Sequence, residues 1–193
     1  MSDTESLQTF TASLGAFGEL VTAVADDQWD ASTPCTDWDV RTLVNHVLVE
    51  QLWAEPMLTG RTVEDVGERL DGDQLGTDPA AAWERAASES LAQFTKEGVL
   101  DSTVNSSRGP LSARQYLGEM TFDLIVHRWD FGQAIDKPQQ LSNDELSFVQ
   151  SVIDAMAPMA ADLIGAGIFA SPVKVASDAD RQTSLLARLG RQG

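Results

Sequence analysis

The fold of this 193-residue chain is decided first by residues 4–27, which read TESLQTFTASLGAFGELVTAVADD. Apolar side chains recur there at alternating spacings of three and four, at Leu7, Phe10, Leu14, Phe17, Val21 and Val24. Because an α-helix repeats every 3.6 residues, this spacing puts the apolar side chains along one stripe. The stretch therefore predicts an amphipathic helix from about Thr4 to Asp27 with one face buried.

Similar helical patterns, each with a start signal, follow further along the chain. The predicted helices cover about residues 38–55, 78–98, 112–135 and 142–165. We expect Asp37 to cap the first of these and Pro56 to end it. Asp78 followed by proline starts the second. The third and fourth begin with capping boxes, in which a serine precedes Gln or Glu by three residues.

The segments between these helices carry weaker signals. Residues 59–77 are polar and rich in glycine, which predicts an exposed loop with room for one short helix, and residues 99–111 are predicted to be irregular. A short extended piece at 169–175 and a small helix at 180–189 complete the chain. Together these patterns predict an all-α protein, a four-helix bundle with a short C-terminal extended segment and small helix. We expect a single domain over residues 1–193, with its appendage starting at about residue 166.

The charge balance excludes several classes of partner. Thirty acidic residues against thirteen basic ones give a net charge of −17, which disfavours nucleic acid and anionic membranes. The N-terminus lacks the pattern of a signal peptide. The sequence also contains no run of about 18 apolar residues, the length that would predict a membrane span. A single cysteine fits a reducing compartment. We therefore expect a cytoplasmic protein with no nucleic-acid or membrane partner.

Candidate chemistry centres on the only two histidines, His46 and His127. Asp123 precedes His127 by four residues, so both side chains lie on one helix face and can reach the same cation. The spacing leaves open the alternative of a plain helix ion pair with a buried, satisfied histidine. A di-iron bundle needs Glu-x-x-His on two helices, which this chain lacks. A non-haem iron site on a jelly roll would need more strands than the sequence predicts.

Three segments resemble a known family. They are residues 32–46 (STPCTDWDVRTLVNH), residues 123–130 (DLIVHRWD) and residues 178–191 (DADRQTSLLARLGR). In this order they are similar to signatures of the DinB/YfiT-like superfamily. More narrowly, they resemble its actinobacterial metal-binding branch, related to the N-terminal domain of mycothiol-dependent maleylpyruvate isomerase. The joint match is specific, whereas either helical motif alone would not be.

The resemblance implies a four-helix bundle with a divalent metal near one end, zinc being expected first and nickel as the alternative. The ligands that it implies are His46, Asp123 and His127, with Asp123 standing where the isomerase is expected to have glutamate. Three protein ligands leave a position open, which neighbouring family members are thought to fill with a thiol such as mycothiol. The expected function is a metal- and thiol-dependent transferase or isomerase acting on an electrophilic small molecule, as a monomer or homodimer. The alternatives are a non-catalytic metal-binding stress or ligand-sensing module and a metal-dependent hydrolase.

A few further residues are weaker candidates. Cys35 precedes a predicted helix N-terminus, where the helix dipole can activate a thiol, although lone cysteines more often fill small buried spaces. Asp130 is expected either to hold a ligand imidazole or to form an ion pair in solvent. Glu50 is a candidate replacement ligand from the helix of His46. Trp38 and Trp129 are expected to pack near the site.

Overall fold

A computed structural model describes residues 2–106 and 109–192. The structure is all-α apart from one short hairpin, which confirms the predicted fold class. The chain forms two compact units, residues 1–137 and residues 138–193. Each unit is described by itself. The predicted appendage from about residue 166 falls inside the second unit, and a single domain over the whole chain stays a prediction.

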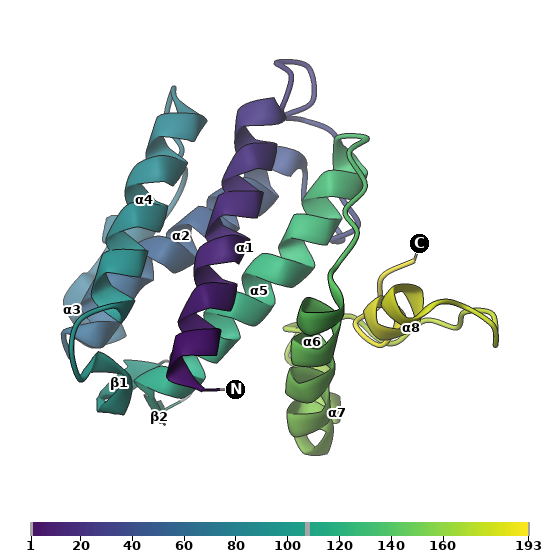
Figure 1. Cartoon of the computed structure of the whole chain (residues 1–193). Helices are drawn as coiled ribbons and strands as arrows, with labels where there is room; N and C mark the ends of the chain where they lie inside the picture. Colours follow the sequence, from purple (N-terminus) through teal and green to yellow (C-terminus); the bar gives the residue numbers. More distant parts are fainter. Residues whose placement is uncertain (1, 107–108, 193) are drawn as a thin grey trace. The chain divides into compact units, whose positions relative to one another are not determined.

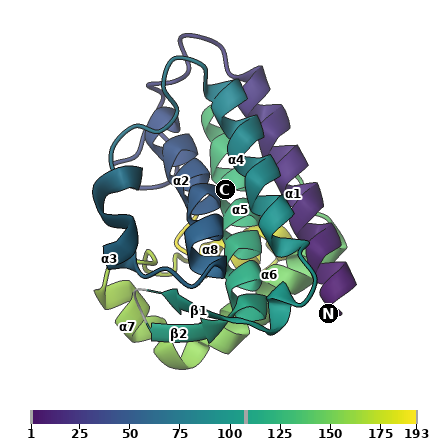
Figure 2. The ribbon, with the colours of Figure 1, turned by 90° about the vertical axis from the view of Figure 1, so that its left-hand side faces the viewer.

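The first unit is the predicted four-helix bundle. Its long helices are α1 (Asp3–Ala23), α2 (Val40–Leu58), α4 (Pro79–Phe94) and α5 (Ala113–Ala134). Helices α1 and α2 each contact both α4 and α5, so the order around the bundle is α1, α4, α2, α5. Figure 1 and Figure 2 show these four helices side by side. The faces of α2 and α5 that meet each other carry the candidate site.

Aromatic side chains fill the centre of the bundle. The Phe17 ring of α1 is fully buried and lies 4.6 Å from the Trp83 ring of α4 and 5.3 Å from the Phe131 ring of α5. Phe10 packs edge-on against Phe94 at 5.3 Å. The stripe predicted for the first helix therefore joins three helices, which supports the amphipathic assignment.

The helix starts follow their capping residues, with one difference. Asp78 caps α4, and the two predicted capping boxes form at Ser112 and Ser142. For α2, however, the predicted cap at Asp37 is wrong: Asp39 accepts from the Thr42 N–H at 2.8 Å, and the helix begins at Val40. Asp37 instead has φ of 66°, a left-handed conformation that aspartate tolerates in turns.

The predicted stop of α2 at Pro56 is also wrong by a few residues. The helix continues to Leu58 with Pro56 in its last turn. Proline at this place removes a single intrahelical hydrogen bond close to an end that frays in any case. The loop after α2 contains the short helix α3 (Val63–Val66) and the 3₁₀ turn η1 (Gly67–Leu70), in line with the predicted short helix.

The region predicted to be irregular, 99–111, is partly ordered. A 3₁₀ turn η2 (Val99–Asp101) precedes a hairpin of β1 (Thr103–Ser106) and β2 (Gly109–Ser112), paired antiparallel. Residues 107 and 108 lie outside the described part of the chain. Val104 points into the core and is fully buried, whereas its neighbours on β1 are not. The strands are too short to show a convincing alternating pattern in the sequence.

The second unit contains α6 (Asn143–Met156), the 3₁₀ turn η3 (Ala157–Met159), α7 (Ala160–Gly165) and α8 (Arg181–Ala187). The helix predicted over 142–165 is thus interrupted at η3, which contains a proline at position 158. The extended piece predicted at 169–175 does not form a regular strand, although the Val173 N–H donates to the Ala187 carbonyl. Asp180 caps α8, which confirms the small final helix.

The helical stretch Asn143–Gly165 in this unit is long and apolar enough, by length and composition alone, to cross a membrane. Only 11% of its most apolar window is buried. The stretch spans the break at η3, and one such helix is weak evidence for a membrane protein. The absence of a membrane partner therefore stays a prediction.

Candidate metal centre

The bundle brings together the three side chains that the resemblance implied as ligands. His46 comes from the second turn of α2, and Asp123 and His127 lie one turn apart on α5. One ligand atom from each residue can be chosen so that all three lie within 4.8 Å of one another. His46 Nε2 is 3.2 Å from Asp123 Oδ2, and His127 Nε2 is 3.4 Å from Asp123 Oδ1.

These separations fit a small divalent cation. Zinc binds nitrogen and oxygen ligands at about 2.1 Å, so two ligands of a tetrahedral ion are about 3.4 Å apart. Asp123 Oδ2 is buried and accepts no well-oriented hydrogen bond among the described residues, despite the nearby His46 ring. A buried carboxylate oxygen without a donor is costly unless a cation satisfies it. The donor set, two imidazoles and a carboxylate, is one that zinc accepts.

The three side chains differ in their exposure. The His46 and Asp123 side chains are 32% and 31% exposed, whereas that of His127 is 9% exposed. The His46 and Asp123 side chains are thus partly exposed, whereas the Asp123 Oδ2 atom itself is buried. Catalytic zinc sites keep one position open, whereas structural sites are closed by four protein ligands.

The charges of the cluster stabilise one another. Burial alone would raise the pKa of Asp123, but His127 and His46 hold it well below its ordinary value. Burial alone would lower the pKa of the His127 imidazole, but the charge of Asp123 and the hydrogen bonds that the ring makes with Asp123, Asp130 and Cys35 raise it well above its usual value. These shifts favour an imidazolium at His127 beside the Asp123 carboxylate in the metal-free cluster, and a divalent cation can replace the proton on His127.

The loop before α2 is a compact turn that packs against this cluster. Ser32 and Asp39 form an isolated antiparallel bridge at its base. Inside it, the Thr33 hydroxyl donates to the Trp38 carbonyl at 2.9 Å and accepts from the Cys35 N–H at 3.1 Å. The turn therefore fixes the positions of Cys35 and Trp38, two residues of the first signature segment.

Trp38 packs against both histidines. Its ring centre lies 4.8 Å from that of His46 and 5.7 Å from that of His127, while the two imidazoles meet edge-on at 5.2 Å. The indole therefore restricts both rings and shields them from water on one side. This confirms that Trp38 packs near the site. Trp129, also on α5, is buried with 3% exposure.

Asp130 and Cys35 lie on the far side of His127. The Asp130 carboxylate is fully buried, with Oδ2 3.0 Å from His127 Nδ1, so the predicted alternative of an ion pair in solvent is wrong. The Cys35 thiol donates to the same oxygen at 3.2 Å and lies 3.7 Å from His127 Nδ1. The sequence analysis missed this link between the loop and α5. Its only signal was the place of Asp130 three residues after His127.

Glu50 lies one turn after His46 on α2 but is outside the three-residue ligand group. Burial and the negative charges of Asp123 and Glu119 raise the pKa of its carboxyl group. Tyr116 lies nearby on α5, and burial together with the charge of Glu50 raises its pKa well above the usual value. Its hydroxyl has no hydrogen-bond partner among the described residues. A protonatable carboxyl and a phenol therefore adjoin the candidate metal centre.

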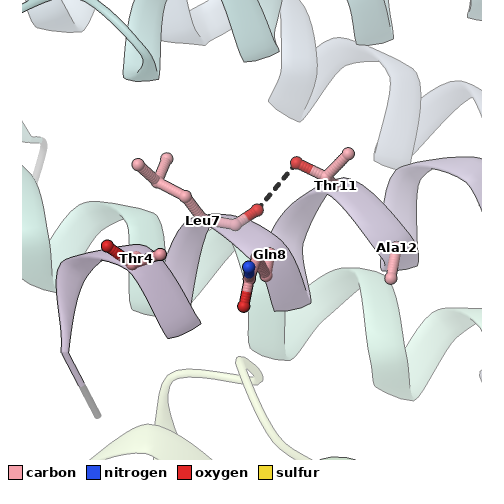
Figure 3. Close-up of a pocket in the computed structure, with 5 residues that line it drawn as sticks. All are labelled: Thr4, Leu7, Gln8, Thr11 and Ala12. Atoms are coloured by element: carbon pink, nitrogen blue, oxygen red, sulfur yellow. Dashed lines mark hydrogen bonds between the residues drawn. The ribbon is translucent and has the colours of Figure 1, made fainter.

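A separate shallow hollow on α1 does not belong to this centre. It is lined by Thr4, Leu7, Gln8, Thr11 and Ala12, as Figure 3 shows. The Thr11 hydroxyl donates to the Leu7 carbonyl at 2.7 Å, which satisfies its polar atom within the helix. None of the five side chains is titratable, so this hollow offers no group for acid–base or metal chemistry.

With this geometry in place, comparison with known proteins identifies the family. The sequence profile of the mycothiol maleylpyruvate isomerase N-terminal domain matches residues 10–132. The chain belongs to this family. The matched region covers α1 through most of α5 and contains the three candidate ligands together with Cys35 and Asp130.

Relatives with curated sequences are similar over most of the chain. Two proteins of Mycobacterium tuberculosis, described as uncharacterized protein MT0763 and uncharacterized protein Rv0738, are each 27% identical over 146 residues. The aligned region covers 72% of this chain and 74% of each relative. No solved structure gives a significant match. Both relatives are mycobacterial proteins described as uncharacterized, so the site must be interpreted from its own geometry.

Proposed function

We propose that the chain is a divalent-metal protein that binds a low-molecular-weight thiol of the mycothiol type and uses it to transform an electrophilic small molecule. The observation that carries this proposal is the convergence of His46 Nε2, an Asp123 oxygen and His127 Nε2 at one point. Membership of the mycothiol maleylpyruvate isomerase N-terminal domain family supports the thiol. The reaction class is group transfer or cofactor-assisted isomerisation.

In this proposal His46, Asp123 and His127 hold the ion, with zinc expected first and nickel as the alternative. A divalent cation lowers the pKa of a coordinating thiol, so that the thiolate form persists at neutral pH. Three protein ligands leave room for that thiol. Trp38 restricts both imidazoles and limits the approach of water from its side.

Glu50 has the position and the environment of a general acid in this scheme. It is half-buried, one helical turn from His46, and burial raises the pKa of its carboxyl group. A protonated carboxyl can donate its proton to a developing negative charge. We therefore assign to Glu50 proton transfer to the electrophilic substrate rather than metal ligation.

The two alternatives predict different behaviour of the same site. A non-catalytic metal module would need the ion but no open position, whereas this group among the described residues offers three ligand atoms, one fewer than a closed structural site. A metal-dependent hydrolase would use water at the open position and would need no thiol. Thiol dependence therefore separates the three functions.

The test is a thiol-conjugation assay on the zinc-loaded protein. Mycothiol is offered with a panel of epoxides, activated alkenes, alkyl halides and cis-dicarboxylate isomerisation substrates, and products are followed by mass spectrometry. We expect thiol-dependent turnover that falls at least about 100-fold in His46→Ala, as for a residue that holds a catalytic metal. Thr42→Ala, an exposed position on the same helix, serves as the matched control and should keep the parent rate.

Each other outcome selects against the proposal. Hydrolysis of a panel epoxide or alkyl halide without thiol would favour the hydrolase. Tight zinc binding without turnover of any substrate would favour the non-catalytic module. Equal turnover by His46→Ala and the parent would place the reaction outside this centre.

A further inference from the structure

The side of His127 that faces away from the proposed metal carries a second set of contacts. Its Nδ1 lies 3.0 Å from Asp130 Oδ2, and the Cys35 thiol donates to that same oxygen at 3.2 Å. Asp130 is fully buried on α5, whereas Cys35 comes from the loop before α2, 95 residues earlier in the sequence. One buried carboxylate oxygen thus receives contacts from both a loop thiol and a candidate ligand.

The Asp130 carboxylate favours one arrangement of the protons on these groups. An ionised carboxylate only accepts hydrogen bonds, so both the thiol and His127 Nδ1 act as donors to Asp130. Once the ion has replaced the proton on Nε2, the proton that stays on Nδ1 leaves the Nε2 lone pair directed toward Asp123, where the ion is proposed to bind. Metal-ligating histidines commonly donate their other ring N–H to a carboxylate, which orients the ring and makes the ligand more basic.

We propose that Cys35, acting through Asp130, is a positioning residue for His127. The inference rests on the proposed metal centre, and it gives the only cysteine of the chain a role as hydrogen-bond donor rather than nucleophile or ligand. The thiol holds the Asp130 carboxylate in place against His127 Nδ1. Thr33 fixes the backbone of Cys35, so the thiol reaches Asp130 on α5 from a loop whose position is defined.

A competing interpretation uses the same atoms. Cys35, His127 and Asp130 also offer ligand atoms within 4.8 Å of one another, which would suit a second metal ion. That ion would have to displace the Nδ1 proton, so filling both sites would require His127 to bind an ion with each ring nitrogen. The positioning role does not require this proton to be lost, because the Cys35 thiol and His127 Nδ1 both keep the protons that they donate to Asp130.

The test combines metal affinity with a spectroscopic readout. Zinc affinity of the full chain is measured by competition with a chromophoric chelator for the parent and for Asp130→Asn, Cys35→Ala and Cys35→Ser. We expect Asp130→Asn to weaken zinc binding about 10- to 100-fold, the usual effect of removing such a partner. Cys35→Ala should weaken it about 2- to 10-fold, the worth of one hydrogen bond, and Cys35→Ser, which keeps a donor, should recover most of that loss.

Thr36→Ala is the matched control, because Thr36 is exposed and adjoins Cys35 in the same loop. It should bind zinc as the parent does. Unchanged zinc affinity in either Cys35→Ala or Asp130→Asn would overturn the inference. A Cys35→Ser variant as weak as Cys35→Ala would also contradict it, because the donor alone would then not explain the effect.

Cobalt substitution distinguishes positioning from ligation. The cobalt-loaded parent should show no sulfur-to-cobalt charge-transfer band in the near ultraviolet. A band that disappears in Cys35→Ala, or uptake of two ions per chain, would establish the competing site and refute the positioning role.

Nitrogen-15 NMR of the histidine rings separates failure of the inference from failure of the proposed function. With only two histidines, a His46→Ala sample assigns both rings. The Nδ1 proton of His127 should exchange slowly with water in the metal-free parent and faster in Asp130→Asn. If the parent bound no metal, the proposed function would fail while this readout still tested the hydrogen bond. Fast exchange in the parent would refute the contact itself.

Discussion

Loading the candidate metal centre with zinc should raise the unfolding temperature of the first compact unit. His46 lies on α2 whereas Asp123 and His127 lie on α5, so an ion bound to all three connects two helices of the bundle. The unfolded chain does not hold these ligands together, and binding to the native state alone stabilises that state. The first unit comprises residues 1–137.

The size of the effect follows from mass action. At a free zinc concentration 100 times the dissociation constant, the free energy of unfolding rises by about 2.7 kcal/mol. Unfolding entropy is about 2.1 cal/mol/K per residue, which gives about 0.3 kcal/mol/K for a unit of this length. Dividing the gain in free energy by this unfolding entropy gives an increase of about 9 °C in the midpoint temperature.

The assay is differential scanning calorimetry of the metal-free full chain with and without zinc. His46→Ala and Asp123→Asn should lose most of the shift, while Thr42→Ala should keep it. A shift of the same size in all variants would mean that zinc binds elsewhere. No shift in the parent at saturating zinc would refute the inference that the ion joins the two helices.

Three further outcomes follow from the structure. Gly18→Ala should destabilise the protein by about 1–3 kcal/mol in urea unfolding, because the added Cβ would lie 2.7 Å from Trp83 Nε1. Gly15 has open space around it, so Gly15→Ala should be neutral or stabilising in the same assay. Phe17→Ala should cost about 3–5 kcal/mol in the same assay, because its fully buried ring joins three helices. Zinc binding should release a proton, because the raised pKa of His127 favours a charged imidazole in the metal-free protein. The apparent zinc affinity should therefore fall as the pH drops. Calorimetry in buffers of different ionisation enthalpy measures the proton release.

The helices of the bundle were predictable because their signals are local. The apolar stripe of α1 and the capping serine of α5 act within one or two turns, and both predictions are confirmed. The start of α2 could not be predicted in the same way, because two aspartates near its beginning are both plausible caps. The choice of Asp39 over Asp37 depends on the tight turn that begins at Ser32.

The hairpin at 103–112 was missed for a different reason. Each strand is four residues long and buries too few apolar side chains to show a period of two. Val104 is fully buried because it lies against the bundle, which is a tertiary effect. Local patterns of hydrophobicity therefore could not distinguish this segment from an irregular loop.

The candidate site also combines features that local sequence signals reveal with contacts that form only in the folded chain. The spacing of Asp123 and His127 is local and placed both on one helix face, whereas His46 joined them only through the family resemblance. The role of Cys35 could not be predicted, because its partner Asp130 is 95 residues away and the contact exists only once α5 packs beside the loop. Sequence spacing alone gives no sign of such a contact.

Elemental analysis of the purified chain tests the central claim most directly. The account predicts about one divalent ion per chain after zinc reconstitution and dialysis, and nearly none in His46→Ala or His127→Ala prepared alongside. Thr42→Ala should retain the parent stoichiometry. Stoichiometric metal that persists in both histidine variants, or a parent that takes up none, would contradict the account.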